Sequence, residues 1–425
     1  MKKVLYISYD GMTDPLGQAQ VLPYLSGLSR QGYRFFILSF EKKERFAIEK
    51  SIVERVCQKA GITWVPLQFH SSPPILSKAY DRMLMKRKAI ELQKKEGFEI
   101  IHCRSYPSTE VGLYLKKRFG VRVVFDVRGF WPDEKIDSGQ WPQDKLFYRL
   151  LYRFYKNKER QFLIKSDQII PQTVAGKKEL IKHYQLAYQN SREPARNGKV
   201  LLGDKITVIP CCADLHHFDF RRFSFNEKQS LREELGIGAD QEVLTYSGTL
   251  GTWYMMDEML QFFQAFKKRY PRAIFLALTK DADIMWKHLH RSTVEEGSVL
   301  IVYASRPEVP LYLSLSDYSI FFVRPTPSKV SASPVKHAEL MAMGIKVICN
   351  DFGDVGKIVN ESGTGVIVEE FSEAGYEKAL DRLENLEISP EKIREAAIKY
   401  FNLETGTHQY KQVYDTILEG SEEQI

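Results

Sequence analysis

The sequence predicts an α/β protein with two doubly wound, Rossmann-like domains, each a parallel sheet covered by helices. The chain has 425 residues, 44% hydrophobic and 27% charged, and this length exceeds one ordinary hydrophobic core. Short apolar runs alternate with stretches whose apolar residues follow helical spacing, which is typical of parallel α/β sheets. The alternation stops near residues 205–214 and then starts again, so we expect two domains.

The first domain is expected to cover residues 1–205. Residues 4–8 form a short apolar run, 21–29 have helical spacing and 33–40 are apolar again, which predicts one strand–helix–strand unit. The further strand candidates in this half are 100–102, 121–127 and 168–171.

The second domain is expected to cover residues 206–400 and to repeat the same pattern. Its strand candidates are 243–247, 273–278, 299–303, 318–323, 346–350 and 365–368. Residues 401–425 are expected to form a terminal helix, because residues 401–417 have amphipathic helical spacing.

Composition excludes several classes of protein. The net charge of +7 is modest for this length, so a dedicated nucleic-acid binder is not expected. The five cysteines are scattered and contain no CxxC pair, so we expect neither a disulfide framework nor a zinc site. The histidines lack companions at ligand spacing, so no metal is expected. The apolar run after Met1 is too short for a signal peptide, and no run could span a bilayer, which favours a cytoplasmic protein.

Two loops are candidates for binding phosphate. Open parallel sheets place ligands at the carboxyl ends of their strands, where helix N-termini offer free N–H groups, so a nucleotide is the natural ligand. Gly17 lies between the first strand and the first helix, and Gly248 with Thr249 follows the first strand of the second half. A glycine lets phosphate approach the backbone, although either segment could simply be a turn.

Residues 331–350 read SASPVKHAELMAMGIKVICN, with a proline suited to a first helical turn and a glycine that ends the helix. This segment resembles the nucleotide-sugar-binding helix of the retaining GT-B glycosyltransferases of family 4. Residues 206–218 and 306–318 resemble the linker and a later segment of that family. Residues 10–24 and 125–134 resemble a bacterial subset that makes surface polysaccharides.

The resemblance implies two domains facing a central cleft, with the terminal helix returning to the first. It also implies transfer of a sugar from a nucleotide-sugar donor, with a UDP-sugar favoured, to a saccharide or lipid-linked saccharide acceptor. Such a reaction retains the anomeric configuration and uses neither a metal nor a cofactor. Two alternatives stay open, namely a nucleotide-sugar epimerase of the same architecture and a non-catalytic sugar-nucleotide-binding scaffold in a polysaccharide assembly complex.

Some functional positions of the family are matched in this sequence, and others are not. Glu339 matches the second glutamate of the family, which holds the ribose hydroxyls of the donor, but the first falls on Ser331. The family's Arg and Lys that neutralise the diphosphate fall on Thr249 and Tyr254. The charge of the diphosphate must therefore be met by other residues.

The expected diphosphate contacts are Arg324, Lys329 and, first of all, Lys336, which lie in or just before the matched helix together with Ser333. The alternative is that these cations are solvated surface charges.

The expected catalytic residues follow the strand that ends near residue 127. Arg128 stands where many relatives have a histidine, and it cannot act as a base. It could bind a donor or acceptor hydroxyl, while Asp133 or Glu134 accepts the proton of the acceptor. The alternative is an internal ion pair between Arg128 and Asp126 or Glu134.

Residues 78–95 and 146–165 mix lysine or arginine with large apolar residues. This pattern suits a helix lying on an anionic lipid surface and predicts a peripheral contact with the inner face of the cell membrane. The alternative is an ordinary helix packed on its sheet.

Overall fold

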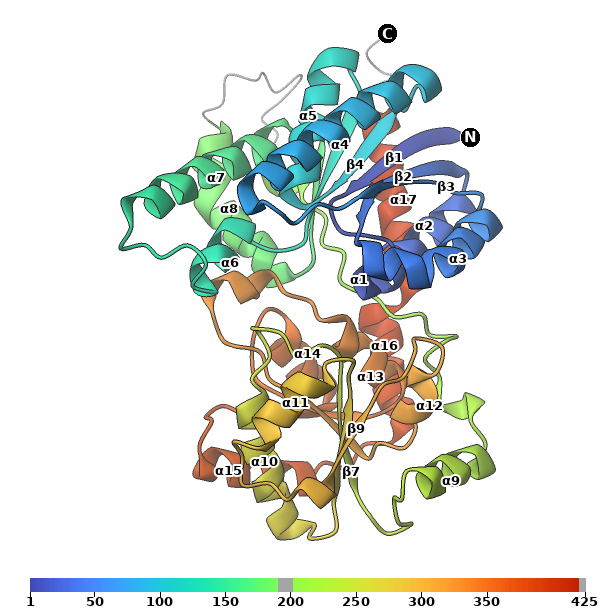
Figure 1. The fold of residues 1–425 in the computed structure, drawn as a ribbon, viewed down its shortest axis with the longest axis vertical. Coiled ribbons are helices and arrows are strands. Elements are labelled where there is room, and N and C mark those ends of the chain that lie inside the picture. Colours follow the sequence, from blue (N-terminus) through green and yellow to red (C-terminus); the bar gives the residue numbers. More distant parts are fainter. Residues whose placement is uncertain (190–201, 420–425) are drawn as a thin grey trace. The chain divides into compact units, whose positions relative to one another are not determined.

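The computed structural model describes residues 1–189 and 202–419 and forms two compact units (Figure 1). Unit 1 consists of Met1–Pro210, Val330–Ala332 and Leu403–Ile425. Unit 2 consists of Cys211–Lys329 and Ser333–Asn402. Unit 1 thus continues past residue 205, and it includes a short segment from the middle of the second half.

The sheet of unit 1 has six parallel strands in the order β3-β2-β1-β4-β5-β6. They are β1 (Lys2–Ser8), β2 (Tyr33–Glu41), β3 (Thr63–Gln68), β4 (Ile100–Arg104), β5 (Arg122–Val127) and β6 (Gln168–Pro171). The sequence predicted all of these except β3. That strand lies at the sheet edge, contains Pro66 and is only partly buried, so it lacks the apolar run of a central strand.

The helices of unit 1 cover both faces of this sheet. They are α1 (Pro15–Gln20), α2 (Leu22–Ser29), α3 (Lys43–Ala60), α4 (Pro74–Glu96), α5 (Ser105–Phe119), α6 (Trp131–Asp137), α7 (Leu146–Lys165), α8 (Val174–Gln189) and α17 (Leu403–Glu419). The C-terminal helix α17 packs against α2, where the rings of Tyr24 and Tyr410 lie 5.3 Å apart. It therefore completes the core of the N-terminal unit.

The sheet of unit 2 also has six parallel strands, in the order β12-β11-β10-β7-β8-β9. They are β7 (Val243–Ser247), β8 (Ile274–Leu278), β9 (Val299–Val302), β10 (Tyr318–Phe321), β11 (Lys346–Cys349) and β12 (Gly365–Ile367). The sequence predicted each of them. Their central residues are buried, so both faces are apolar and the strands appear as continuous hydrophobic runs.

Helices again surround this sheet. They are α9 (Phe225–Glu234), α10 (Met256–Arg269), α11 (Ala282–Leu289), α12 (Val309–Leu313), α13 (Val335–Ala342), α14 (Val355–Ser362), α15 (Glu373–Glu384) and α16 (Pro390–Phe401). Phe262, Phe263 and Phe266 of α10 are fully buried, and they pack with Phe275 of β8 in the core of this unit.

Both sheets are wound identically, because each first strand pairs with the second strand on one side and the fourth on the other. The strand order therefore reverses between β1 and β4 in unit 1, and between β7 and β10 in unit 2. Ligands of open α/β sheets bind at the carboxyl ends of the strands at such a point. Within the described residues, no helix has the length and apolar character needed to cross a membrane.

Candidate functional site

The loop after β7 lies at the reversal point of unit 2. Gly248 has φ 130°, a left-handed conformation that favours glycine, and its N–H donates to the carbonyl of Leu278 at 2.9 Å. The Tyr246 hydroxyl donates to the carbonyl of Thr249 at 2.6 Å, while the Thr249 side chain is exposed. Hydrogen bonds from the sheet thus hold this loop in place.

Lys336, the second residue of α13, reaches this loop. A Cβ atom on Gly248 would lie 2.9 Å from Lys336 Nζ, so the missing side chain makes room for the ammonium group. Nζ lies 4.1 Å from the ring centroid of Tyr246 and 3.7 Å from that of Tyr254. It is buried and has no hydrogen-bond partner in the part of the chain that the structure describes.

This environment is unfavourable for a cation. Burial lowers the pKa of Lys336 well below its ordinary range, and the charge of Glu339 opposes this effect only in part. The faces of two tyrosine rings attract the ammonium but cannot accept its N–H groups as an anion would. A bound anion would therefore both supply acceptors and raise the pKa of Lys336 again.

Glu339 lies nearly one helical turn further along α13. Its Oε1 accepts from Arg306 Nη1 at 3.0 Å, and its side chain is mostly buried. The guanidinium of Arg306 also lies 5.4 Å from the ring centroid of Phe218. A carboxylate has two oxygens with several acceptor positions, so Glu339 can still accept hydroxyl groups while Arg306 holds it.

The other predicted donor contacts lie in different surroundings. Lys329 is buried, and its Nζ lies 3.7 Å from the ring centroid of Trp253, next to the tyrosine that contacts Lys336. The Arg324 side chain is exposed. Ser333 Oγ accepts from the N–H of Cys211 at 3.2 Å and so helps to hold the linker segment. The structure thus brings Gly248 and Lys336 together, and it gives Ser333 a structural hydrogen bond.

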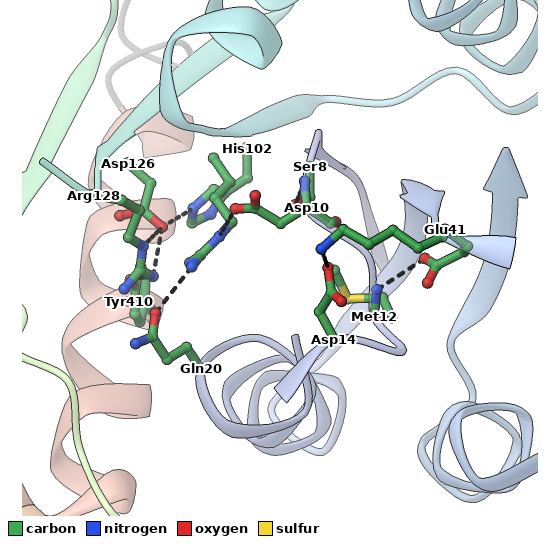
Figure 2. Close-up of polar contacts among 12 residues, drawn as sticks. Ser8, Asp10, Met12, Asp14, Gln20, Glu41, His102, Asp126, Arg128 and Tyr410 are labelled. Atoms are coloured by element: carbon green, nitrogen blue, oxygen red, sulfur yellow. Dashed lines mark hydrogen bonds and ion pairs between the residues drawn. The ribbon is translucent and has the colours of Figure 1, made fainter. Parts of the chain in front are cut away.

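The equivalent loop in unit 1 follows β1 (Figure 2). The buried Glu41 carboxylate accepts from the N–H groups of Met12 at 2.8 Å and Thr13 at 3.0 Å. A Cβ on Gly17 would lie 2.3 Å from the carbonyl oxygen of Gly11, so Gly17 lets α1 pack against this loop. A carboxylate of the chain itself occupies an anion position here, and the role of Gly17 as a donor contact stays a prediction.

Arg128 forms the internal ion pair that was one of its two predicted alternatives. Its Nε donates to Asp126 Oδ2 at 2.9 Å, and its Nη2 donates to the hydroxyl of Tyr410 at 3.3 Å (Figure 2). His102 Nε2 lies 3.4 Å from the same Asp126 oxygen. Burial alone would raise the pKa of Asp126, but the Arg128 charge and the His102 hydrogen bond lower it below its ordinary value.

The two predicted bases lie on α6. Asp133 accepts from the Tyr152 hydroxyl at 2.8 Å and from Lys156 Nζ at 2.9 Å, so it ties α6 to α7. The Glu134 carboxylate faces the backbone of Gly129, where a Cβ would lie 2.8 Å from Oε1. The catalytic assignment of Arg128, Asp133 and Glu134 stays a prediction.

Sequence reasoning missed the partners of several of these residues. Glu41, His102, Arg306 and Tyr410 come from strands, loops or helices distant in the chain, and no short motif connects them. Ser331, where the resemblance places the first family glutamate, belongs to unit 1 and is buried beside Gly176. Among residues 1–189 and 202–419, no three His, Cys, Asp or Glu side chains are grouped so as to hold a metal ion.

Two family models match the chain. Residues 19–217 match the model described as Glycosyltransferase Family 4. Residues 227–400 match the model described as Glycosyl transferases group 1. No curated protein matches the chain by sequence.

Solved structures resemble the whole chain. Sucrose-phosphate synthase from Thermosynechococcus elongatus has a TM-score of 0.71 at 15% identity, covering 99% of this chain and 100% of its own. Anabaena HepE in complex with UDP-glucose has a TM-score of 0.66 at 13% identity, covering 99% of this chain and 100% of its own. WaaG, a glycosyltransferase involved in lipopolysaccharide biosynthesis, has a TM-score of 0.64 at 14% identity, covering 96% of this chain and 98% of its own.

Proposed function

Because the chain is a glycosyltransferase with the GT-B fold, we propose that it transfers a sugar from a UDP-sugar to a saccharide or lipid-linked saccharide acceptor in polysaccharide or surface-glycan assembly. The observation that carries this proposal is the buried ammonium of Lys336, which lacks a hydrogen-bond acceptor among the described residues. A diphosphate supplies the acceptors and the negative charge that this group requires. The choice of uridine is supported by HepE, which was solved with UDP and with UDP-glucose.

In the proposed complex the diphosphate contacts Lys336, and the ribose hydroxyls donate to Glu339. The absence of a side chain at Gly248 allows a phosphate to approach the same nitrogen. When the bond to the sugar breaks, the departing UDP gains negative charge. Lys336 stabilises this charge most effectively because it lies in a site that excludes water.

The proposed reaction needs neither a metal nor a cofactor, and it retains the configuration of the transferred sugar. Lys336 replaces the divalent ion that neutralises a diphosphate in other enzymes, with Lys329 and Arg324 as further candidate cations. Turnover should persist in excess EDTA. If EDTA abolished turnover and manganese or magnesium restored it, the assignment of charge neutralisation to Lys336 would be wrong.

On the acceptor side, Asp133 or Glu134 is proposed to take the proton of the acceptor hydroxyl. Arg128 is proposed to bind a hydroxyl of the donor or acceptor. The proposed location is the cytoplasm, with peripheral contact to the inner face of the cell membrane. A lipid-linked acceptor would be reached there.

Calorimetric titration of UDP tests the donor site. Lys336→Met should weaken UDP binding by about 10- to 150-fold, because a hydrogen bond to a charged group contributes about 1.5–3 kcal/mol. The matched control is Lys287→Met, since Lys287 is an exposed lysine of α11. Equal UDP affinity in the Lys336 variant and the control would contradict the proposal.

Turnover separates transfer from the two alternatives. Release of UDP from a UDP-sugar should require an acceptor saccharide. Conversion of the donor without any acceptor would indicate an epimerase. UDP-sugar binding without release, for every acceptor in a saccharide panel, would indicate a scaffold.

A further inference from the structure

Helix α7 exposes a stripe of large apolar side chains. Phe147, Leu150 and Phe154 are 62%, 54% and 53% exposed. Their spacing of three and four residues places them on one face of the helix. Three large side chains together in water mark a binding surface, whereas a single exposed one needs no explanation.

Helix α4 exposes a second stripe of the same kind. Leu76, Tyr80 and Met83 are 68%, 46% and 51% exposed, again with helical spacing. Arg82 of α4 donates to the Tyr155 hydroxyl of α7 at 2.8 Å, so the two helices lie close together. We call Leu76, Tyr80, Met83, Phe147, Leu150 and Phe154 the α4–α7 face.

Basic residues lie beside the α7 part of this face. Arg149 and Arg153 are exposed beside the α7 stripe, and no ion pair of either occurs in the described parts of the chain. Phe154 also lines a groove of about 800 Å³ between α5 and α7. Four lysines line it, namely Lys116, Lys117, Lys158 and Lys165. Two of these lysines are ion-paired, Lys158 with Glu110 at 2.6 Å and Lys116 with Asp167 at 2.9 Å, so the groove keeps a smaller net positive charge.

We propose that the α4–α7 face docks on the surface of an anionic lipid bilayer. Apolar side chains between cations match a bilayer interface, where acyl chains lie beneath negatively charged headgroups. A second copy of this chain fits poorly, because it would bring two basic surfaces together. This inference deepens the proposed function and rests on its membrane location, because it names the surface that contacts the membrane; docking itself needs neither donor nor acceptor.

Vesicle co-sedimentation of the full chain tests the proposal. The protein should bind vesicles of phosphatidylglycerol and phosphatidylcholine more tightly than vesicles of phosphatidylcholine alone. Combined Phe147→Ser, Leu150→Ser and Phe154→Ser should lower the partition coefficient by about tenfold or more. Combined Arg149→Glu and Arg153→Glu should lower it mainly on the anionic vesicles.

The matched control is Ile48→Ser with Ile52→Ser on α3. These isoleucines are 70% and 46% exposed in the same unit and are spaced by one helical turn. In α3, however, Glu44, Glu49 and Glu54 offset three of the five basic residues, and Lys50 pairs with Glu54 at 3.6 Å. This variant should bind vesicles like the wild type. All substituted side chains are exposed, so melting temperatures should hardly change.

Three outcomes would overturn the proposal. The first is vesicle binding that the triple variant leaves unchanged, and the second is an equal loss of binding in the α3 control. The third is a wild type that is dimeric in light scattering while the triple variant is monomeric. The last would identify a second copy as the occupant. UDP affinity and turnover on a water-soluble acceptor should stay at wild-type values in the triple variant, so failure here is distinguishable from failure of the proposed function.

Discussion

The two sheets have the same strand order, but the charged side chains at the point where that order reverses differ. In unit 1, the Glu41 carboxylate occupies the loop after β1 and accepts from two backbone N–H groups. In unit 2, the Lys336 ammonium beside the loop after β7 has no acceptor among the described residues. One topology thus provides two candidate anion positions, and the chain fills one with its own side chain.

This difference separates a structural loop from a binding loop. A buried anion with its hydrogen bonds satisfied holds a loop in one conformation. A buried cation without an acceptor costs stability, which a protein tolerates where a ligand supplies the missing acceptor. The five predictions below alter one side of the comparison at a time.

The largest effect is expected for Glu41→Ala. It should lower the free energy of unfolding by about 2–6 kcal/mol, because two buried N–H groups each lose their acceptor at a cost of about 1–3 kcal/mol. Urea denaturation measures the loss, and Glu44→Ala at an exposed site of α3 serves as the control. Phosphate should raise the melting temperature of the Glu41 variant more than that of the wild type. A stability equal to that of the control would show that the loop does not depend on this carboxylate.

Lys336→Met should act in the opposite direction on stability. We expect the ligand-free variant to gain about 1–3 kcal/mol in the free energy of unfolding, because a buried polar group without an acceptor is replaced by an apolar one of similar length. Denaturation of the wild type and variant without nucleotide gives the value. A loss of stability together with unchanged UDP binding would mean that the lysine serves the fold.

Glu339→Ala should weaken UDP binding by about tenfold or more, since hydrogen bonds to a charged acceptor contribute about 1.5–3 kcal/mol each. The matched ligand is 2′,3′-dideoxyuridine diphosphate, which lacks the ribose hydroxyls and should bind wild type and variant alike. Arg306→Ala leaves the carboxylate in place and should cost less affinity for UDP. If both variants lost equal affinity for both ligands, Glu339 would act only through its contact with Arg306.

The smallest expected effect is the uptake of a proton when UDP binds. Burial lowers the pKa of Lys336 in the free protein, and a bound diphosphate should raise it, so binding should take up a proton. UDP affinity should therefore fall as pH rises between these two pKa values, by at most about tenfold per pH unit. Calorimetry above about pH 8, where the terminal phosphate is ionised, measures the uptake in buffers of different ionisation enthalpy. Equal proton uptake by wild type and Lys336→Met would contradict this prediction.

The same lysine links pH to stability in the ligand-free protein. Between its lowered pKa in the folded chain and its ordinary value, the unfolded chain binds the additional proton. The contribution of Lys336 to the free energy of unfolding therefore rises with pH in this window. Lys336→Met should remove that contribution.

Local sequence determined the two parallel sheets, because strands buried on both faces are apolar runs and their connecting helices have helical spacing. It also placed Glu339 and Lys336 on one helix, since both lie within a single turn of one motif. It missed β3, whose half-buried edge position leaves a weak apolar signal. The return of the terminal helix to the first domain was expected from the family resemblance, whereas its packing against α2 had no local signal.

Only the tertiary structure decided which charges are satisfied. Glu41 and Met12, Asp126 and His102, and Arg306 and Glu339 are separated by 29, 24 and 33 residues. Whether a charged side chain is paired depends on which distant segment folds beside it and how far water is excluded, and neither quantity is a property of a short sequence pattern. The sequence therefore identified Lys336 as a candidate cation, and the packing of Tyr246, Tyr254 and Gly248 around it left its ammonium buried without an acceptor.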